Sequence, residues 1–278
     1  MLWFSTSMPE LPEVETIVQQ FKKKLVGKKI NSVEIINGKV VGHDVKKISG
    51  MKIVAVKRRA KSIIIELSGK KFLLVHLRMT GHFHYVSKGK KLDSFFEKFV
   101  VARFHFSDGS MLTHNSIRCF GSIRLLSLEK LEKELSKLGP EPLEISFKEF
   151  SEIILGKKGN IKTTIMDQKV IVGIGNIYAQ EALYYAGIDP QRKCGDLSSN
   201  EVKKLYNQMK RVLRLAIKHH GTTIENYAHI EGPGDFQNQL AVYQCKKCPK
   251  KHLLKKISLG GRGTYYCSQC QKIGRAHV

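Results

Sequence analysis

Four cysteines near the C-terminal end have the spacing of metal ligands. Cys245 and Cys248 form one C-x2-C pair and Cys267 and Cys270 form a second, with 18 residues between the pairs. Two such pairs supply the four thiolates of a tetrahedral zinc site. Because four sulfur ligands leave no open coordination position, we expect one structural Zn²⁺ ion. His252 lies between the pairs and is a possible substitute ligand.

The segment that carries these cysteines is strongly basic. Residues 245–272 contain eight lysines and arginines and no acidic residue. Arg262 lies in the sequence Gly-Gly-Arg-Gly, where glycines allow the backbone to come close to a ligand and the guanidinium can bind a phosphate with two N–H groups. The pattern predicts a zinc hairpin that binds phosphate.

The overall charge points to a polyanionic partner. The chain has 278 residues, 48 of them basic and 24 acidic, which gives a formal charge of +24. Such a surplus attracts nucleic acid or an anionic membrane surface. No run reaches the ~18 apolar residues of a membrane span, and cysteines with this spacing indicate zinc in a reducing compartment. We therefore expect a nucleic-acid partner, no membrane and a cytoplasmic location.

The elements that must position these groups change type along the chain. The predicted strands are Lys29–Ile36, Met51–Lys57, Ser62–Leu67, Phe72–Leu77, Val100–Phe106 and Ser122–Leu126. Short strands without intervening helices favour an antiparallel sandwich or barrel. The predicted helices are Pro12–Leu25, Phe147–Leu155, Asn176–Ala186 and Ser198–His219. The breaker Gly139–Pro142 is the expected boundary between the strand-rich and helix-rich parts.

Five motifs, in their order along the chain, resemble one protein family. They are Met8–Thr16, Arg58–Lys61, His76–Gly81, Gly173–Ala179 and Gly263–Cys267. Together they resemble the bacterial formamidopyrimidine-DNA glycosylases, over residues 9–272. Leu11 favours this branch over the related endonuclease VIII branch, which typically begins Pro-Glu-Gly-Pro.

The resemblance implies an α+β multidomain fold. It consists of an N-terminal antiparallel β-sandwich with flanking helices (residues 8–138), a helix–two-turn–helix DNA-binding domain (139–236) and a C-terminal zinc-finger hairpin (237–272). The implied activity belongs to base excision repair. Oxidised purines, namely 8-oxoguanine and formamidopyrimidines, are removed from damaged double-stranded DNA, and the strand is then cut by β,δ-elimination. The family expectation is a monomer associated with the bacterial nucleoid.

The resemblance also assigns the catalytic residues. The nucleophile is the amine of Pro9, which forms a Schiff base once Met8 is removed. A terminal amine has a pKa of about 8, against about 10.4 for lysine, so a useful fraction is neutral at physiological pH. Glu10 is the implied proton donor, Lys61 a proton donor and phosphate contact, and Arg262 a phosphate contact for δ-elimination. Without the resemblance, Glu10 is an acid that favours a helix N-terminus.

Further DNA contacts are implied by motif position. Met79, Arg118 and Phe120 are expected to fill the gap that a flipped base leaves in the stack. From composition alone, Met79 and Phe120 would be core residues. Asn176 and Tyr178 join Lys61 and Arg262 as DNA-binding residues, and a loop over Ala228–Phe236 is expected to cap the flipped base.

The turn before Phe120 departs from the family. The chain reads Ser-Ile-Arg-Cys-Phe-Gly over Ser116–Gly121, where the family usually has Asp-Pro-Arg-Arg-Phe-Gly. The sequence therefore specifies the chemistry of the reaction better than it specifies which base is preferred in the strand opposite the damaged base.

Both ends carry residues that the resemblance does not explain. The mechanism needs Pro9 as the first residue, so we expect translation to start at Met8 and Met1–Ser7 to be spurious. Residues Ile273–Val278 resemble translated sequencing-adapter DNA.

Two other functions stay open at this level. One is an endonuclease VIII-like glycosylase for oxidised pyrimidines. The other is a non-catalytic zinc-finger DNA-binding protein, which would result if Pro9 is not the free N-terminus.

Overall fold

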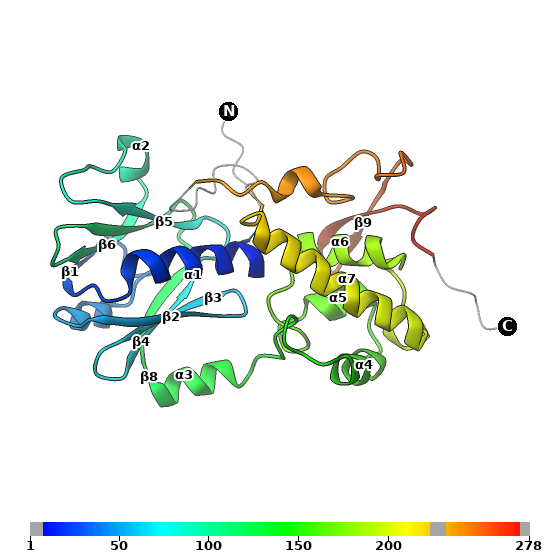
Figure 1. Cartoon of the computed structure of the whole chain (residues 1–278), viewed down its shortest axis with the longest axis horizontal. Helices are drawn as coiled ribbons and strands as arrows, with labels where there is room; N and C mark the ends of the chain where they lie inside the picture. The colour runs from blue at the N-terminus through cyan, green and yellow to red at the C-terminus, as the bar shows by residue number, and fades with distance from the viewer. Residues whose placement is uncertain (1–7, 223–231, 273–278) are drawn as a thin grey trace. The chain divides into compact units, whose positions relative to one another are not determined.

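The computed structural model describes residues 8–222 and 232–272 and contains two compact units (Figure 1). The first consists of Met1–Ser136 and His220–Asp235, and the second of Lys137–His219 and Phe236–Val278. The expectations for Met1–Ser7, for Ile273–Val278 and for the part of the capping loop before residue 232 lie outside the described residues. Each unit is described by itself below.

The first unit is built on two four-stranded antiparallel sheets. One sheet has the order β1 (Ile30–Ile35), β6 (Val100–Phe106), β7 (Met111–Ser116), β5 (Gly81–Val86). The other has the order β2 (Ile53–Arg59), β3 (Ser62–Leu67), β4 (Lys71–His76), β8 (Ser122–Ser127). Shorter elements are η1 (His43–Ile48), α2 (Ser94–Glu97) and α3 (Leu128–Leu135). The predicted sandwich is confirmed.

Two strands of this sandwich were not expected from the sequence. β5 and β7 carry His82, His84, Thr113 and Asn115 where an apolar strand face would carry valine or isoleucine. The structure nevertheless buries Thr113 and Asn115 completely, because Thr113 donates a hydrogen bond to the Asn115 amide oxygen at 2.8 Å. Polar residues that satisfy one another inside a sheet leave no hydrophobic periodicity to detect.

Helix α1 (Leu11–Leu25) contributes its apolar face to the core of this unit. Val14, Ile17, Phe21 and Leu25 recur at helical spacing and are at most 3% exposed. The Phe21 ring lies edge-on against Phe83 of β5, with 5.0 Å between the ring centroids. This packing fixes the axis of α1 and therefore the place where the helix begins.

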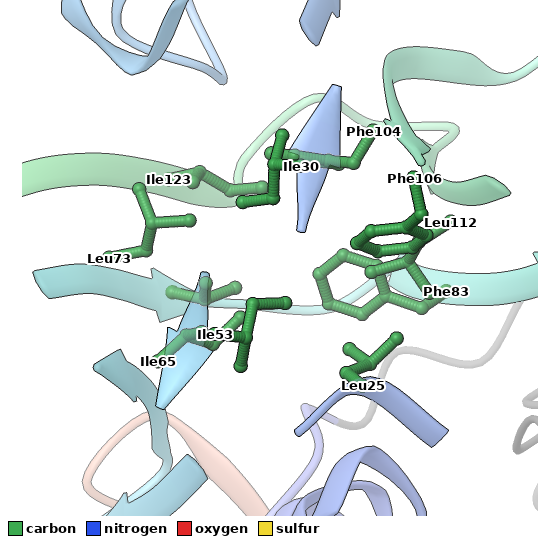
Figure 2. Close-up of a pocket in the computed structure, with 11 residues that line it drawn as sticks. Leu25, Ile30, Ile53, Ile65, Leu73, Phe83, Phe104, Phe106, Leu112 and Ile123 are labelled. Carbon is green, nitrogen blue, oxygen red and sulfur yellow. The ribbon is translucent and has the colours of Figure 1, made fainter. Parts of the chain in front are cut away.

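Figure 2 shows a hollow inside the sandwich core, and this hollow is apolar. Its labelled lining residues are leucines, isoleucines and phenylalanines that come from α1 and from strands of both sheets, and their side chains point toward one another. A small ligand site needs some polar groups to orient its ligand. The hollow is therefore part of the core and not a substrate site.

The second unit is helical and ends in a hairpin. Its elements are α4 (Phe147–Leu155), α5 (Ile161–Met166), α6 (Asn176–Ala186), η2 (Cys194–Asp196), α7 (Ser199–Lys218), η3 (Phe236–Gln239), β9 (Lys255–Leu259) and β10 (Arg262–Tyr266). α7 starts at a capping box in which Ser198 and Glu201 exchange hydrogen bonds. Its predicted apolar face is buried from Val202 to Ala216. No helix in residues 8–222 or 232–272 is long and apolar enough to cross a membrane.

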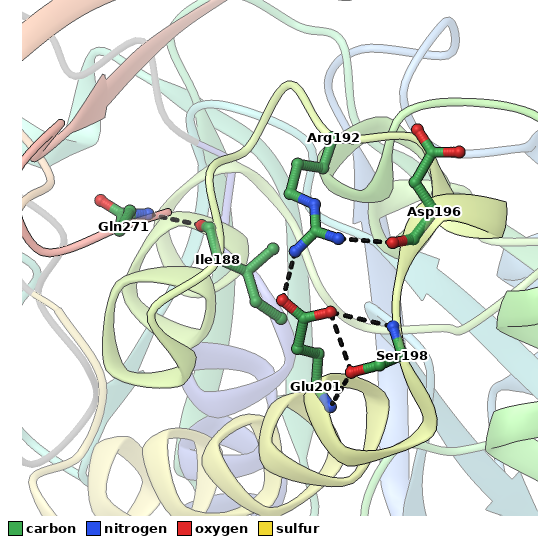
Figure 3. Close-up of polar contacts among 6 residues, drawn as sticks. All are labelled: Ile188, Arg192, Asp196, Ser198, Glu201 and Gln271. Atoms are coloured by element: carbon green, nitrogen blue, oxygen red, sulfur yellow. Dashed lines mark hydrogen bonds and ion pairs between the residues drawn. The ribbon is translucent and has the colours of Figure 1, made fainter. Parts of the chain in front are cut away.

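An ion pair fixes the connection between α6 and α7 (Figure 3). Arg192 donates to the Glu201 carboxylate and to the carbonyl oxygen of Asp196, while Ser198 N–H donates to Glu201 Oε2 at 2.9 Å. Burial acts to raise the pKa of Glu201, but the hydrogen bonds from Arg192 and Ser198 outweigh it and hold this pKa below its ordinary value. The connection is thus anchored on the first turn of α7.

Candidate active site and nucleic-acid interface

The chain enters α1 through a buried acidic site. Pro9 is buried, and Glu10 and Glu13 are each 3% exposed. The Glu13 carboxylate accepts the Glu10 N–H at 2.9 Å through Oε2, and the Thr222 N–H at 2.8 Å and hydroxyl at 3.1 Å through Oε1. A buried carboxylate with several donors is well compensated for its lost hydration. Glu13 therefore positions the backbone next to Pro9.

Two glycines allow close packing around this carboxylate: one lies against the carboxylate itself and the other against the backbone of the first. Gly221 has φ +77°, and a Cβ there would lie 2.7 Å from Glu13 Oε1. A Cβ on Gly234 would lie 2.4 Å from the carbonyl oxygens of Gly221 and His220. Both contacts are too short for any residue with a side chain, so glycine is required at both positions.

Lys61 lies in the turn between β2 and β3 and is 8% exposed. The preceding residue, Ala60, has a φ of 54°, in the left-handed region. Arg58 holds this turn: its Nε donates to Glu15 Oε2 at 2.8 Å and its Nη1 donates to the Ala60 carbonyl at 3.1 Å. Since Glu15 belongs to α1, the helix that begins after Pro9 also anchors the turn that carries Lys61.

The three residues expected to fill the gap in the base stack lie together. The Arg118 guanidinium donates to Met79 Sδ at 3.5 Å, and its central carbon lies 4.9 Å from the centroid of the Phe120 ring. Phe120 is 54% exposed, which rules out the alternative that it is a core residue. A large exposed aromatic ring next to a cation is suited to contact with bases.

The altered turn at Cys119 is held by local hydrogen bonds. Cys119 adopts a left-handed φ of 52°, and its N–H donates to Ser116 Oγ at 3.1 Å. The Arg118 N–H donates to Thr80 Oγ1 at 2.9 Å. Serine and aspartate both accept such turn hydrogen bonds. Ser116 therefore supports the turn in a chain that lacks the family's usual aspartate.

In the second unit, a buried lysine holds the start of α6 against the hairpin. Lys162 is fully buried, and its ammonium donates to Asn176 Oδ1 and to Thr264 Oγ1, each at 2.7 Å. Asn176 Nδ2 donates in turn to the Gly263 carbonyl at 3.1 Å. Asn176 is thereby placed beside β10, which begins with the exposed Arg262. The sequence analysis missed Lys162, whose only signal is a lysine between buried isoleucines.

Two further residues of α6 hold the chain that forms the hairpin. Gln180 accepts the Tyr265 N–H at 2.6 Å. The fully buried Glu181 accepts three backbone N–H groups, at 2.8–3.0 Å, from residues 241–243. Burial raises the pKa of Glu181, against the lowering effect of these hydrogen bonds. Neither residue was singled out from the sequence, because their partners are backbone groups far along the chain.

Tyr178 is placed differently from the other predicted DNA-binding residues. It is 1% exposed, and its ring packs against Phe236, with 5.6 Å between the ring centroids. The side chain therefore belongs to the core of the second unit, and only its backbone in the first turn of α6 is suited to approach DNA.

The side chains of the hairpin that could hold a metal ion include three of the four predicted cysteines. The ligand atoms that lie within 4.8 Å of one another belong to Cys248, His252, Cys267 and Cys270. Cys245 lies outside this group, and its Sγ is 3.6 Å from each of the carbonyl oxygens of Leu240 and Tyr243. Three thiols and one imidazole fit a single structural Zn²⁺ ion, which would supply no open position for catalysis.

Comparison with known proteins matches three family models along the chain. The formamidopyrimidine-DNA glycosylase N-terminal domain matches residues 8–123 and the formamidopyrimidine-DNA glycosylase H2TH domain matches residues 138–228. A zinc finger found in FPG and IleRS matches residues 245–273.

The sequence relatives cover nearly the whole chain. The formamidopyrimidine-DNA glycosylase of Carboxydothermus hydrogenoformans is 39% identical over an alignment of 278 positions, which covers 95% of this chain and 100% of that protein. The corresponding protein of Mycoplasma mobile is 36% identical and covers 96% of this chain, again over its full length.

Solved structures agree with these relatives. A Lactococcus lactis FPG variant in complex with DNA containing Fapy-dG has a TM-score of 0.87 and 31% identity over 95% of this chain and 100% of that one. The Lactococcus lactis Fpg in complex with abasic-site DNA has the same TM-score and identity over 95% of this chain and 99% of its own.

The sandwich, the helix–two-turn–helix unit and the zinc hairpin together define a class of DNA glycosylases. Within that class, the chain belongs to the formamidopyrimidine-DNA glycosylase family. The endonuclease VIII-like alternative is not favoured by these matches.

Proposed function

We propose that this chain removes oxidised purines, such as 8-oxoguanine and formamidopyrimidines, from double-stranded DNA and then cuts the strand at the abasic site. The observation that carries this proposal is the buried entry to α1, where Glu13 holds the backbone beside Pro9 and Glu10. The activity belongs to base excision repair, and the enzyme works as a monomer in the bacterial cytoplasm, at the nucleoid.

The chemistry starts at the Pro9 nitrogen. When Pro9 is the first residue, its secondary amine has a pKa of about 8 and is partly neutral near pH 7. The amine attacks C1′ of the damaged nucleotide, the bond from C1′ to the base breaks, and the base leaves with a proton. The C1′–O4′ bond then breaks as the sugar ring oxygen takes a proton, which leaves an iminium between the Pro9 nitrogen and C1′. The iminium acidifies the C2′ proton, and its removal allows elimination of the 3′ phosphate and then of the 5′ phosphate.

Glu10 moves the protons in this sequence. It protonates the sugar ring oxygen during the attack and carries protons in the later steps. Its 3% exposure keeps the carboxyl group away from bulk water, and the Glu13 contact fixes the backbone that bears it. Lys61, on the turn that Arg58 anchors, provides a positively charged group for proton transfer and phosphate contact.

Binding to damaged DNA uses polar and aromatic groups of both units. Lys61, Asn176 and Arg262 contact phosphates, with Lys162 holding Asn176 in place. Phe120, Arg118 and Met79 occupy the space left when the damaged base leaves the stack. The surplus of positive charge supports sequence-independent, salt-sensitive binding.

Borohydride trapping tests the nucleophile. A protein that starts at Pro9 should form a covalent adduct with a duplex that contains 8-oxoguanine, because borohydride reduces the Schiff base to a stable amine. The same chain starting at Met1 is the matched control, since its Pro9 nitrogen is an amide. Equal adduct yields from the two proteins would assign the nucleophile to another residue, and DNA binding without any adduct would support the non-catalytic alternative.

A second experiment, a comparison of excision rates, tests the substrate class. Duplexes with an oxidised purine and with an oxidised pyrimidine are compared at equal enzyme concentration. Faster excision of the purine is expected, and faster excision of the pyrimidine would overturn that assignment while leaving the Pro9 chemistry intact.

A further inference from the structure

We propose that the end of the first unit far from Pro9 binds the phosphate backbone of a second, undamaged DNA duplex, so that one protein molecule holds two duplex segments at once. The residues of this lysine surface are Lys22, Lys23, Lys29, Lys52 and Lys70, all of them exposed. The inference goes beyond the proposed function, because it concerns where undamaged DNA binds and does not depend on the chemistry of Pro9.

The strand register separates two ends of the sandwich. At the first end Ser62 pairs with His76, and His76 pairs with Ser122. The residues of the first unit that are proposed to contact damaged DNA lie in the connections at this end: Lys61, Met79, Arg118 and Phe120. At the second end Leu67 pairs with Lys71. The six residues of β3 span the two ends, a distance of about 20 Å at about 3.3 Å per residue.

Helix α1 runs from the first end to the second. It begins after Pro9, and it stops where the Gly27 N–H donates at 2.9 Å to the carbonyl of Ile53, the first residue of β2. Its last turn is basic and carries Lys22 and Lys23. The lysines of α1 are therefore separated from Pro9 by the length of the helix, about 22 Å for 15 residues.

Lys29 and Lys52 lie directly opposite each other at the second end, in an antiparallel bridge. The Ser68 N–H donates to the Lys52 carbonyl at 2.8 Å, which places the turn between β3 and β4, with Lys70, beside the same bridge. Like charges directly opposite each other on neighbouring strands destabilise the fold. A phosphate backbone bound at this end would relieve that repulsion.

Two of these lysines border an open hollow that contains little opposing charge. The hollow measures about 550 Å³, and its lining includes Lys23, Lys29 and Asp108. The Asp108 carboxylate accepts hydrogen bonds from Lys28 and, at 2.6 Å, from the Ser110 hydroxyl, so it is already paired. Within residues 8–222 and 232–272, no carboxylate forms an ion pair with any lysine of the surface.

Helix stability explains only part of this surface. Cations in the last turn of a helix interact favourably with the helix dipole, which accounts for Lys22 and Lys23. Lys29, Lys52 and Lys70 lie outside the helices, so their charges stabilise no helix end. A polyanionic partner accounts for both groups of lysines.

Duplex DNA fits this surface better than a single strand does. Lysine ammonium groups contact phosphates without reading the bases. Phe106, the aromatic residue in the lining of the hollow, is 4% exposed and gives no ring surface for base stacking. Undamaged duplex surrounds every lesion, so a second segment is within reach of a protein that is bound to the first.

Binding of a second duplex to an occupied protein tests the proposal. The full chain is saturated with an unlabelled duplex that carries an abasic-site analogue, and a fluorescent undamaged duplex is then titrated. We expect binding at about 10⁻⁶–10⁻⁴ M, with a slope of log affinity against log salt of about −4, as for counterion release from about four or five phosphates. Sedimentation should give the mass of one chain with two duplexes. Binding of only one duplex per chain would overturn the proposal.

The triple variant Lys23→Gln/Lys29→Gln/Lys52→Gln tests the lysine surface itself. Glutamine keeps the helix propensity and most of the side-chain length but removes the charge. Affinity for the second duplex should fall by at least about tenfold, and the salt slope should shrink by about 2.7. Affinity for the analogue duplex should stay within about twofold, and the denaturant midpoint should not fall, because the repulsion between Lys29 and Lys52 is gone.

The control variant Lys148→Gln/Lys203→Gln/Lys204→Gln removes the same charge from exposed positions of α4 and α7. It should leave the affinity for the second duplex within about twofold. Equal losses in the two triple variants would assign the binding to net charge and overturn the lysine surface.

Two other probes test the kind of partner. Single-stranded DNA of equal length and a polyglutamate peptide each replace the fluorescent duplex, and both should bind the occupied protein more weakly than the duplex does. Tighter binding of either probe, lost in the surface variant, would overturn duplex DNA as the occupant. Base excision separates this proposal from the proposed function: the surface variant should excise at the rate of the unmodified protein. Absence of excision in both proteins would contradict the proposed function and leave the second-duplex measurement valid.

Discussion

The backbone beside Pro9 in the first unit and Asn176 in the second unit are each held by a buried charged group, and the two groups have opposite sign. In the first unit the Glu13 carboxylate gathers donors from Glu10 and Thr222. In the second unit the Lys162 ammonium gathers the acceptors of Asn176 and Thr264. A carboxylate accepts hydrogen bonds and here gathers backbone N–H groups, whereas an ammonium only donates and here gathers side-chain oxygens. The first arrangement serves the reacting centre and the second serves phosphate binding.

The largest expected effect comes from Glu10, the acid next to the buried carboxylate. Glu10→Gln keeps the shape and the backbone contact to Glu13 but removes the proton donor. Single-turnover base excision should fall by about 10²–10⁴-fold, with duplex binding unchanged. Glu129→Gln, at an exposed position of α3, is the control and should leave excision unchanged. Excision by Glu10→Gln at the rate of the unmodified protein would remove Glu10 from the mechanism.

Substitutions of Glu13 test whether the first unit depends on the hydrogen bonds that this carboxylate accepts. Glu13→Leu leaves the Glu10 N–H and both Thr222 donors without their acceptor. The free energy of unfolding should fall by about 3 kcal/mol, and excision should fall with it. Glu13→Gln keeps one acceptor oxygen and should lose less in both denaturant unfolding and single-turnover assays. Equal losses in the two variants would mean that the carboxylate charge, and not the hydrogen bonds, matters.

Lys162→Met tests the opposite arrangement in the second unit. The variant keeps an unbranched apolar chain but frees Asn176 from the hairpin. We expect duplex affinity to fall by about 10-fold, or about 1.4 kcal/mol, with a smaller slope of log affinity against log salt. Base excision at saturating DNA should change less than affinity does. A loss of excision without a loss of affinity would break the division of roles between the two units.

Acid should destabilise the first unit through two of its histidines, His114 and His84. Burial, reinforced by the charge of His82, lowers the pKa of His114 to about 3, and burial lowers that of His84 to about 4. Between these values and about 6.5 the unfolded chain binds protons that the folded chain does not. The contribution of these neutral histidines to the free energy of unfolding should therefore be complete above pH 6.5. As the pH falls it should decline by about 1.4 kcal/mol per pH unit for the fully buried His114 and by less for the partly exposed His84.

His114→Leu checks this assignment. Neither ring nitrogen of His114 has a hydrogen-bond partner among the described residues, so leucine removes no such contact. Denaturant unfolding from pH 7 to pH 4.5 should show a slope smaller by about one proton. An unchanged slope would place the acid sensitivity elsewhere.

The smallest effect on stability is expected at Phe120. Because the ring is 54% exposed, Phe120→Ala should change the free energy of unfolding by less than about 0.5 kcal/mol. Excision should nevertheless fall by about 10-fold, since stacking on an aromatic ring contributes about 1–3 kcal/mol per base. A large loss of stability would show that Phe120 belongs to the core after all.

Much of the fold follows from local patterns. Helices α1 and α7 appear where apolar residues recur at helical spacing, with Pro12 and Ser198 near their starts. The six predicted strands are present, because their hydrophobic runs are bounded by turn residues. Strands β5 and β7 were missed because buried histidine, threonine and asparagine give no such pattern. Met79, Arg118 and Phe120, which motif position singled out, lie next to one another in the first unit.

The sequence by itself determined the family, the helices with strong periodicity and the presence of a zinc hairpin, since each depends on residues that are close along the chain. Only the tertiary structure decided that Thr222 meets Glu13, that Lys162 meets Thr264, and that the His252 imidazole lies beside Cys248, Cys267 and Cys270. The physical reason is that a buried charge or a metal ligand is selected by which atoms converge in space. Convergence between residues 102 or 209 positions apart leaves no local pattern in the sequence.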